Sequence, residues 1–326
     1  MRDALIRKAQ EGVKVRVLMD NLITLTAPEY FYRKMRKAGI EVAYVHDFDK
    51  LCLGESVASI FGFRDHRKIV VIDGEVAYTG GMNLNDNYFY RWRDTHLRIE
   101  GPVVARLQAS FIDSWVSSGG RLNHPLSYYF SQPAPITWDA PLKGKNMQIV
   151  TDAAENQHPA TLLGYEWILQ NARDYVYIHT PYFVPPTSFL NALKSAALRG
   201  VDVRIILPEK VDTPLVGPAN RSVYGECLEA GVRIYDRSGE FIHSKALVCD
   251  DSLCIVGASN LDMRSFFVNS EVNTFIYDRE TALYCKEHFI RDLEGNHEWT
   301  LESWKNSRKW YQEMGSHFMR LFYRLL

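Results

Sequence analysis

Long apolar runs and an excess of charge are both missing from this sequence. It contains no stretch of eighteen apolar residues, so we expect no helix within it to span a membrane, while contact with a membrane surface stays open. The 38 basic and 39 acidic residues leave a formal charge of −1, which gives the chain as a whole no electrostatic attraction for nucleic acid. Nucleic acid is therefore not an expected partner, and any phosphate chemistry must come from local placement of charge.

Cysteine is also scarce. The five cysteines are odd in number, and none has the CxxC or Cys/His spacing of a metal site. Two of them, Cys249 and Cys254, lie inside apolar runs that are typical of buried strands. We interpret all five as reduced thiols of the core, and we expect neither a metal ion nor another cofactor.

What the sequence does contain is an internal repeat. The stretch FRDHRKIVVIDGEVAYTGGMN at 63–83 matches FIHSKALVCDDSLCIVGASN at 241–260 with a constant offset of 177. A chain of 326 residues, 46% of them hydrophobic, is long enough to build a core for each copy. The offset pairs His66 with His243, Lys68 with Lys245, Asp73 with Asp250, Gly80 with Gly257, Asn83 with Asn260 and Asp94 with Glu271.

Helix ends followed by strands repeat upstream of the matched stretches. AQEGVKVRVLMD at 9–20 matches ALRGVDVRIILPE at 197–209, and KAGIEVAYV at 37–45 matches EAGVRIYDR at 229–237. In each, a glycine stands where a helix is expected to end before a β-branched run. The chain is therefore predicted to be two copies of one α/β unit, with the first at 1–125, a linker at 126–146 and the second at 147–295.

The two copies differ in length. The second has a helix and a strand before its first matched helix, and the first has room for neither. About fifty residues of a complete first unit are thus expected to be absent, and its sheet is expected to lack an edge or a central strand. The first copy also carries an insertion, HDFDKLCLGESVASIFGF at 46–63, which we expect near the mouth of the site.

The repeated residues suit phosphate chemistry. Alternation along a strand puts His66 and Lys68 on one face, and His243 and Lys245 likewise. If two such strands meet at a pseudo-twofold axis, one imidazole can attack phosphorus while the other protonates the leaving oxygen. A single HxK pair is usually a solvated strand end, but two copies in register are not explained that way. The donors expected to bind phosphate are Lys68, Asn83, Lys245 and Asn260.

Four carboxylates repeat as well. A nucleophilic histidine needs an acceptor at its second nitrogen to fix the tautomer, and we assign this task to Asp94 and Glu271. Asp73 and Asp250 belong to the motif, but at the far ends of the strands we expect them to tie down local backbone or a basic partner. The predicted catalytic set is His66, Lys68, Asp73, His243, Lys245 and Asp250.

At these residues the chain resembles the phospholipase D superfamily, whose HxKxxxxD motif, followed by GSxN, appears twice per active site. The serine position of GSxN is Gly81 in one copy and Ala258 in the other, a departure that affects a secondary phosphate contact. Within the superfamily the chain is similar to the bacterial cardiolipin synthases over nearly its whole length. Segments that carry this similarity include RWRDTHLRIEGPVV, IHTPYFVPPTSFLNALKSAALRGVDVRIILP and ASNLDMRSFFVNSEVNTFIYD.

The resemblance implies a fold and a reaction. The fold is α/β, with two pseudo-twofold-related α/β/α units, each a central mixed β-sheet flanked by helices. The reaction transfers a phosphatidyl group between two phosphatidylglycerol molecules, giving cardiolipin and glycerol through a phosphohistidine. By analogy His66 is the nucleophile and His243 the general acid and then base, while the reverse assignment stays open. Alternatives are hydrolysis in the same pocket, as a phospholipase or nuclease, and an inactive membrane-binding remnant.

The resemblance also implies a place at the bacterial inner membrane. Family members usually carry two N-terminal transmembrane helices and then the first strand of the catalytic region, and this sequence shows neither. We expect a peripheral protein whose partners are phosphatidylglycerol and other anionic phospholipids. Residues 296–326 predict an amphipathic helix at the membrane interface, or else a helix packed on the second unit's core. Its apolar stripe is Trp310, Met314, Phe318, Leu321 and Leu325, beside Arg320 and Arg324.

Overall fold

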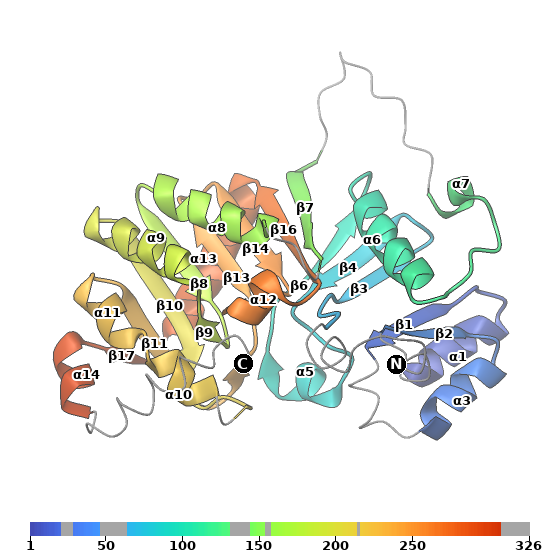
Figure 1. Ribbon diagram of the computed structural model, residues 1–326, viewed down its shortest axis with the longest axis horizontal. Helices are drawn as coiled ribbons and strands as arrows, with labels where there is room; N and C mark the ends of the chain where they lie inside the picture. Colours follow the sequence, from blue (N-terminus) through green and yellow to red (C-terminus); the bar gives the residue numbers. More distant parts are fainter. Residues whose placement is uncertain (21–28, 46–63, 131–143, 154–157, 214–215, 308–326) are drawn as a thin grey trace, which may run out of the picture.

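The second half of the chain is built on one mixed sheet, as a computed structural model shows (Figure 1). The model describes residues 1–20, 29–45, 64–130, 144–153, 158–213 and 216–307. The eight strands have the order β17-β11-β10-β8-β13-β14-β16-β7, in which β11, β10 and β8 are parallel and the other neighbours are antiparallel. Their bounds are β7 Asn146–Asp152, β8 Tyr175–His179, β10 Asp202–Pro208, β11 Arg233–Arg237, β13 Ala246–Cys249, β14 Leu253–Gly257, β16 Glu271–Tyr277 and β17 His297–Trp299.

Helices cover both faces of this sheet. α8 (Ala160–Asn171) and α9 (Thr187–Leu198) pack on one face, and α13 (Arg279–Leu293) packs on the other (Figure 1). Strand β8 is buried along its whole length, which explains its nearly continuous apolar sequence, YVYIH. Gly200 and Gly231 follow α9 and α11 (Tyr224–Glu229) at φ +92°, where the sequence predicts helix ends. The predicted α/β/α unit is therefore confirmed in this half.

The first half carries matching elements in two smaller sheets. β1 and β2 form a parallel pair, and β3, β4 and β6 form an antiparallel sheet against helix α6. In the second half β8 joins the parallel strands to the antiparallel ones, and no described residue of the first half forms its counterpart. Among the described residues of the first half, the pair β1–β2 and the sheet β3–β4–β6 are therefore not joined by a strand. The bounds are α1 Arg2–Gln10, β1 Arg16–Asp20, α3 Glu29–Lys37, β2 Glu41–Val45, β3 Ile69–Ile72, β4 Val76–Gly80, β6 His96–Glu100 and α6 Val104–Ser117.

Equivalent apolar residues differ in exposure between the halves. Phe266 is 1% exposed, because it packs against Tyr165 of α8, whereas its counterpart Phe89 is 54% exposed. Leu261 is 2% exposed and its counterpart Leu84 is 61% exposed. The described part of the first half therefore lacks the layer that covers these positions in the second.

Two short backbone pairings join the halves. β5 (Trp92–Arg93) runs parallel to β12 (Phe241–Ile242), and Asp65 bridges to Ser270 at the equivalent place. A shared apolar cluster lies between them, in which Ala77, Ile99 and Leu107 meet Ala258 and Val272. The remaining short elements are α5 Asp86–Tyr90, α7 Leu126–Tyr129, β9 Phe183–Val184, α10 Val216–Arg221, β15 Leu261–Asp262, α12 Met263–Phe267 and α14 Leu301–Ser307.

The C-terminal segment differs from the single interfacial helix predicted from residue 296 onwards. Residues 297–299 form β17, which pairs with β11, and Trp304 of α14 is buried against Tyr224 and Trp299. A free strand edge and an aromatic pocket on the second unit bind this part of the chain, so residues 297–307 belong to that unit. The apolar stripe at 310–325 and the insertion at 46–63 lie outside the described residues.

Replacing Trp304 tests this packing. Trp304→Ala is expected to lower the free energy of unfolding by about 3 to 5 kcal/mol, because it empties a buried aromatic site. Trp167→Ala is the matched control, since Trp167 is 62% exposed, and it is expected to change the unfolding free energy by about 0.5 kcal/mol at most. Urea unfolding followed by circular dichroism measures both. Equal effects of the two substitutions would contradict the packing described for α14.

Candidate active site

The two HxK segments lie side by side at the junction of the halves, each just ahead of a strand. His66 and Lys68 precede β3, and His243 and Lys245 precede β13. Each segment is fixed by backbone of the other half. The His66 amide donates to the Ser270 carbonyl at 2.9 Å, and the His243 amide donates to the Arg93 carbonyl at 2.8 Å. The pairings that join the halves therefore also position both histidines.

The orienting carboxylates are exchanged between the halves. Nδ1 of His66 lies 2.9 Å from Oε1 of Glu271, and Nδ1 of His243 lies 2.8 Å from Oδ2 of Asp94. The side chains of Glu271 and Asp94 are 0% and 1% exposed, so each carboxylate needs its partner. A carboxylate that accepts from Nδ1–H leaves the lone pair on Nε2, which is the state a nucleophile or base requires. The sequence identified both carboxylates but not their exchange.

The two lysines lie under the histidines. Nζ of Lys68 donates to the carbonyl of His66 at 2.6 Å, and Nζ of Lys245 donates to that of His243 at 2.6 Å. Burial lowers the pKa of Lys68 to about 8 and that of Lys245 to about 7, although the nearby carboxylates oppose the effect. The charged form of each lysine is therefore poorly stabilised in this site, and a phosphate oxygen would stabilise it.

Burial also shifts the other groups of the site. It lowers the pKa of His66, although the Glu271 carboxylate opposes the effect, and together with the charges of Lys245 and Lys68 it lowers the pKa of His243 well below its usual value. Burial raises the pKa of Asp94 to about 6. Burial acts in the same direction on Glu271, but His66 and Lys68 outweigh it and hold the pKa of that carboxyl below its usual range. Near neutral pH the site therefore holds two neutral imidazoles and two carboxylates.

The asparagines flank the histidines. Asn83 Nδ2 donates to the hydroxyl of Tyr88 at 2.7 Å, and that hydroxyl lies 3.4 Å from Nε2 of His243. Asn260 is 5% exposed, and its Oδ1 is buried with no hydrogen-bond partner among the residues that the structure describes. This amide oxygen is an acceptor, so a hydroxyl of a bound ligand could satisfy it. Sequence reasoning found the asparagines but not Tyr88, which no motif marks.

The motif aspartates lie at the opposite ends of the strands from the histidines. Asp250, at φ +48°, accepts from the backbone amides of Arg173, Asp174 and Tyr175 at 2.8, 3.0 and 2.9 Å, and so anchors the start of β8. Asp73 is exposed in the turn between β3 and β4. Asp250 thus binds local backbone, as its place in the sequence predicted, while the catalytic grouping of Asp73 and Asp250 stays a prediction.

Gly81, which departs from the family's serine, has a steric explanation. A Cβ at this position would lie 2.2 Å from Oδ1 of Asp94. Any side chain here would displace the carboxylate that contacts His243. The glycine therefore makes room for the exchanged histidine–carboxylate pair of the second half.

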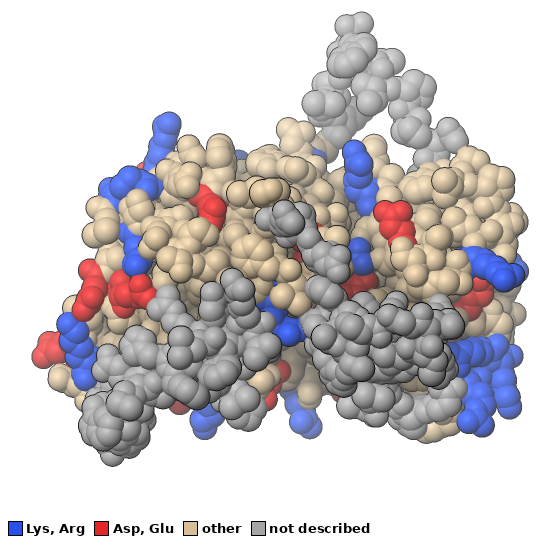
Figure 2. Space-filling view, in the orientation of Figure 1, with Lys and Arg blue, Asp and Glu red and all other residues tan. Residues whose placement is uncertain are grey.

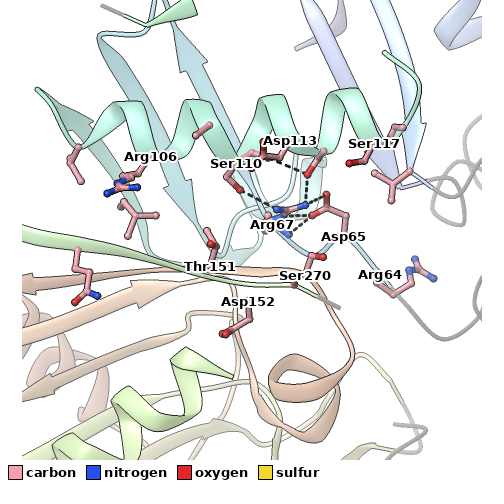
Figure 3. Close-up of a pocket in the computed structure, with 18 of the residues that line it drawn as sticks. Arg64, Asp65, Arg67, Arg106, Ser110, Asp113, Ser117, Thr151, Asp152 and Ser270 are labelled. Carbon is pink, nitrogen blue, oxygen red and sulfur yellow. Dashed lines mark hydrogen bonds and ion pairs between the residues drawn. The ribbon is translucent and has the colours of Figure 1, made fainter. Parts of the chain in front are cut away.

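A cavity of about 1000 Å³ lies behind the His66 segment, between α6 and β7 (Figure 3). The guanidinium of Arg67, which lines the cavity, donates to Oδ2 of Asp65 at 2.8 Å. It also donates to the hydroxyls of Ser110 at 3.0 Å and Ser114 at 2.5 Å, both on α6. Arg64 pairs with Asp20 at 3.0 Å. These contacts fasten the catalytic segment to α6 and β1. They give a structural role to three charged residues that the sequence left unassigned.

Comparison with known proteins places these observations in a family. A family model described as "Cardiolipin synthase, PLD-like domain" matches residues 1–115 and 166–293. The chain belongs to this family. Each of its two HxK segments pairs its histidine with a carboxylate of the other half. Among the described residues, no group of three or more His, Cys, Asp or Glu could hold a metal ion.

Relatives in this family cover most of the chain. The major cardiolipin synthase ClsA of Bacillus subtilis is 38% identical over 318 residues, 95% of this chain and 64% of that protein. The cardiolipin synthase of Halalkalibacterium halodurans is 33% identical over 332 residues, 100% of this chain and 64% of that protein. The chain thus spans just under two thirds of these curated relatives. A solved phosphatidylserine synthase from Haemophilus influenzae shares the fold, with a TM-score of 0.63 at 15% identity over 99% of this chain and 90% of that one.

The lowered lysine pKa values predict a coupling between anion binding and protons. At pH 8 Lys245 is mostly neutral, and a bound dianion raises its pKa and that of Lys68, so binding takes up roughly one proton. Sulfate is a suitable probe because it does not titrate in this range. Calorimetric titration in buffers of different ionisation enthalpy measures the uptake, and Lys245→Met is expected to reduce it. Sulfate binding without proton uptake would contradict the lysine assignment.

Proposed function

We propose that the protein is a phosphatidyltransferase that joins two phosphatidylglycerol molecules into cardiolipin and glycerol. The observation that carries this proposal is the pair of histidines, each with a carboxylate from the other half and a lysine that donates to its backbone carbonyl. Two histidines of this kind can divide a double displacement at phosphorus between a nucleophile and an acid–base group. The names of the relatives, cardiolipin synthases at 33 to 38% identity, support cardiolipin as the product.

The first step forms a covalent intermediate. Nε2 of His66 attacks phosphorus, the bond from phosphorus to the glycerol oxygen breaks, and His243 gives its Nε2 proton to that oxygen. His243 starts this step as an imidazolium, because the negative charge of the substrate raises the pKa that burial had lowered. That proton is taken up from solvent when the substrate binds, and the Lys245 ammonium remains a donor to the phosphate. The products of the step are glycerol and phosphatidyl-His66.

The second step reverses the roles. A hydroxyl of a second phosphatidylglycerol gives its proton to Nε2 of His243, its oxygen bonds to phosphorus, and the bond from phosphorus to His66 breaks. Lys68, Lys245, Asn83 and Asn260 supply donors for the phosphate oxygens in both steps. The His66 side chain is 25% exposed and that of His243 is 6% exposed, which favours His66 as the group that receives the lipid phosphate.

A membrane surface is the proposed place of action. No helix among the described residues combines the length and apolar character needed to cross a bilayer. Charges of both signs are mixed over the face in Figure 2, and basic atoms gather at the end where α1 and α3 lie. α3 carries Arg33, Lys34, Arg36 and Lys37, a composition that attracts anionic lipid. We infer a peripheral protein on the bacterial inner membrane that binds phosphatidylglycerol and related anionic phospholipids.

The reaction is tested with the purified chain and vesicles of dioleoyl phosphatidylglycerol. Cardiolipin and glycerol in equal amounts are expected, measured by mass spectrometry. Phosphatidic acid without cardiolipin would favour the alternative, a phospholipase D-type hydrolase. No product from either reaction would leave the membrane-binding remnant as the better description.

The roles of the two histidines are tested with a phosphatidyl ester of p-nitrophenol. This leaving group needs no protonation, so His243→Ala is expected to keep a burst of p-nitrophenol and to accumulate phosphatidyl-His66. His66→Ala is expected to release none. On phosphatidylglycerol both variants should lose activity by about 10² to 10⁴-fold. A burst in His66→Ala alone would reverse the assignment.

A further inference from the structure

The two halves of the site differ in the position of one hydroxyl group. The repeat pairs Tyr88 with Ser265. Ser265 is fully buried, its Oγ accepts from the backbone amide of Asn260 at 3.1 Å, and its side chain also hydrogen-bonds to Glu271, so it supports the carboxylate of a dyad and does not contact a histidine nitrogen in any described hydrogen bond. Tyr88 instead reaches into the other half, where its hydroxyl lies 3.4 Å from Nε2 of His243. One half thus places a hydroxyl at the reactive nitrogen of a histidine, at a point where the other half uses its hydroxyl for anchoring.

The hydrogen bonds around Tyr88 have a definite direction. The Asn83 amide donates to the Tyr88 oxygen at 2.7 Å, and Nδ1–H of His243 donates to Asp94 at 2.8 Å. The lone pair of His243 is therefore on Nε2, and the Tyr88 O–H points its proton there, beside the ammonium of Lys245 at 2.9 Å. Burial raises the pKa of Tyr88, so the group stays a hydroxyl throughout the working range.

Aromatic rings hold this hydroxyl in place. Tyr88 packs edge-on against the His243 ring at 4.9 Å between centroids, and Trp92 stacks on the same ring at 5.4 Å. The rings of Tyr88 and Trp92 also pack against each other, with 4.7 Å between their centroids. The two rings cover the imidazole on the Tyr88 and Trp92 sides, and a hydroxyl that approaches Nε2 there must replace or join that of Tyr88. A water molecule gains little by doing so, because it only substitutes one hydroxyl for another.

We propose that Tyr88 is a catalytic residue that selects an alcohol over water as acceptor of the phosphatidyl group, by occupying the place of the acceptor hydroxyl at His243. An acceptor with a polyol headgroup makes further contacts in the site and displaces the Tyr88 hydroxyl, whereas a lone water does not. The proton of the accepted alcohol then passes to Nε2, its oxygen bonds to phosphorus, and the bond to His66 breaks. The inference rests on the proposed function and deepens it.

Tyr88→Phe removes only the hydroxyl and so tests the proposal. With dioleoyl phosphatidylglycerol vesicles in ¹⁸O-labelled water, the ratio of ¹⁸O-phosphatidic acid to cardiolipin is expected to rise at least about fivefold, because water enters the vacated place. Tyr90→Phe is the matched control, since Tyr90 is 82% exposed on the same helix, and its ratio should equal that of the unchanged protein.

Three outcomes distinguish a failure of the Tyr88 inference from a failure of the proposed function. If the unchanged protein makes cardiolipin and Tyr88→Phe keeps its product ratio, Tyr88 has a structural role and the inference is wrong. If the unchanged protein makes phosphatidic acid and no cardiolipin, the proposed function fails and the selectivity with it. If Tyr88→Phe does not fold, as judged by circular dichroism, Tyr88→Leu replaces it and must shift the ratio in the same direction.

Discussion

The site depends on one reciprocal contact, in which each histidine is held by a carboxylate from the other half of the chain. Glu271 and Asp94 are almost completely buried, and a buried carboxylate without a partner is strongly destabilising. The dyads therefore stabilise the docked halves, and the docked halves orient the dyads. The backbone bonds at Ser270 and Arg93 and the apolar cluster around Ala258 hold the same interface from either side. Loss of register at this junction would disorient both histidines at once.

Burial gives the site its affinity for an anion. Burial lowers the pKa values of the two lysines and the two histidines, and for the lysines the nearby carboxylates only partly oppose the effect. A phosphodiester adds the missing negative charge, which restores the lysines to their charged form and allows one histidine to hold a second proton. Substrate binding and protonation for catalysis are thus one electrostatic event.

The internal repeat made much of this site predictable. Because it preserves a histidine, a lysine, an asparagine and a carboxylate at equal spacing, these residues could be chosen without a structure. The exchange of Asp94 and Glu271 could not, because alternation along a strand sets the face of a residue and not the partner across a junction. Tyr88 escaped for a related reason, since its role depends on a contact over 155 positions of sequence. The packing of residues 297–307 on the second unit was the less favoured of two interpretations, because an aromatic stripe with basic residues is also typical of a membrane interface.

The exchange of carboxylates also bears on how such a protein can arise. Because the exchange is reciprocal, a single unit paired with an identical copy of itself would assemble the same two dyads. In such a homodimer the two subunits have the same sequence, so any substitution near one histidine also occurs near the other. Joining the copies in one chain removes that obligation, so that tyrosine can stand at 88 while serine stands at 265. Gene fusion, in this view, is the event that let two equivalent histidines specialise.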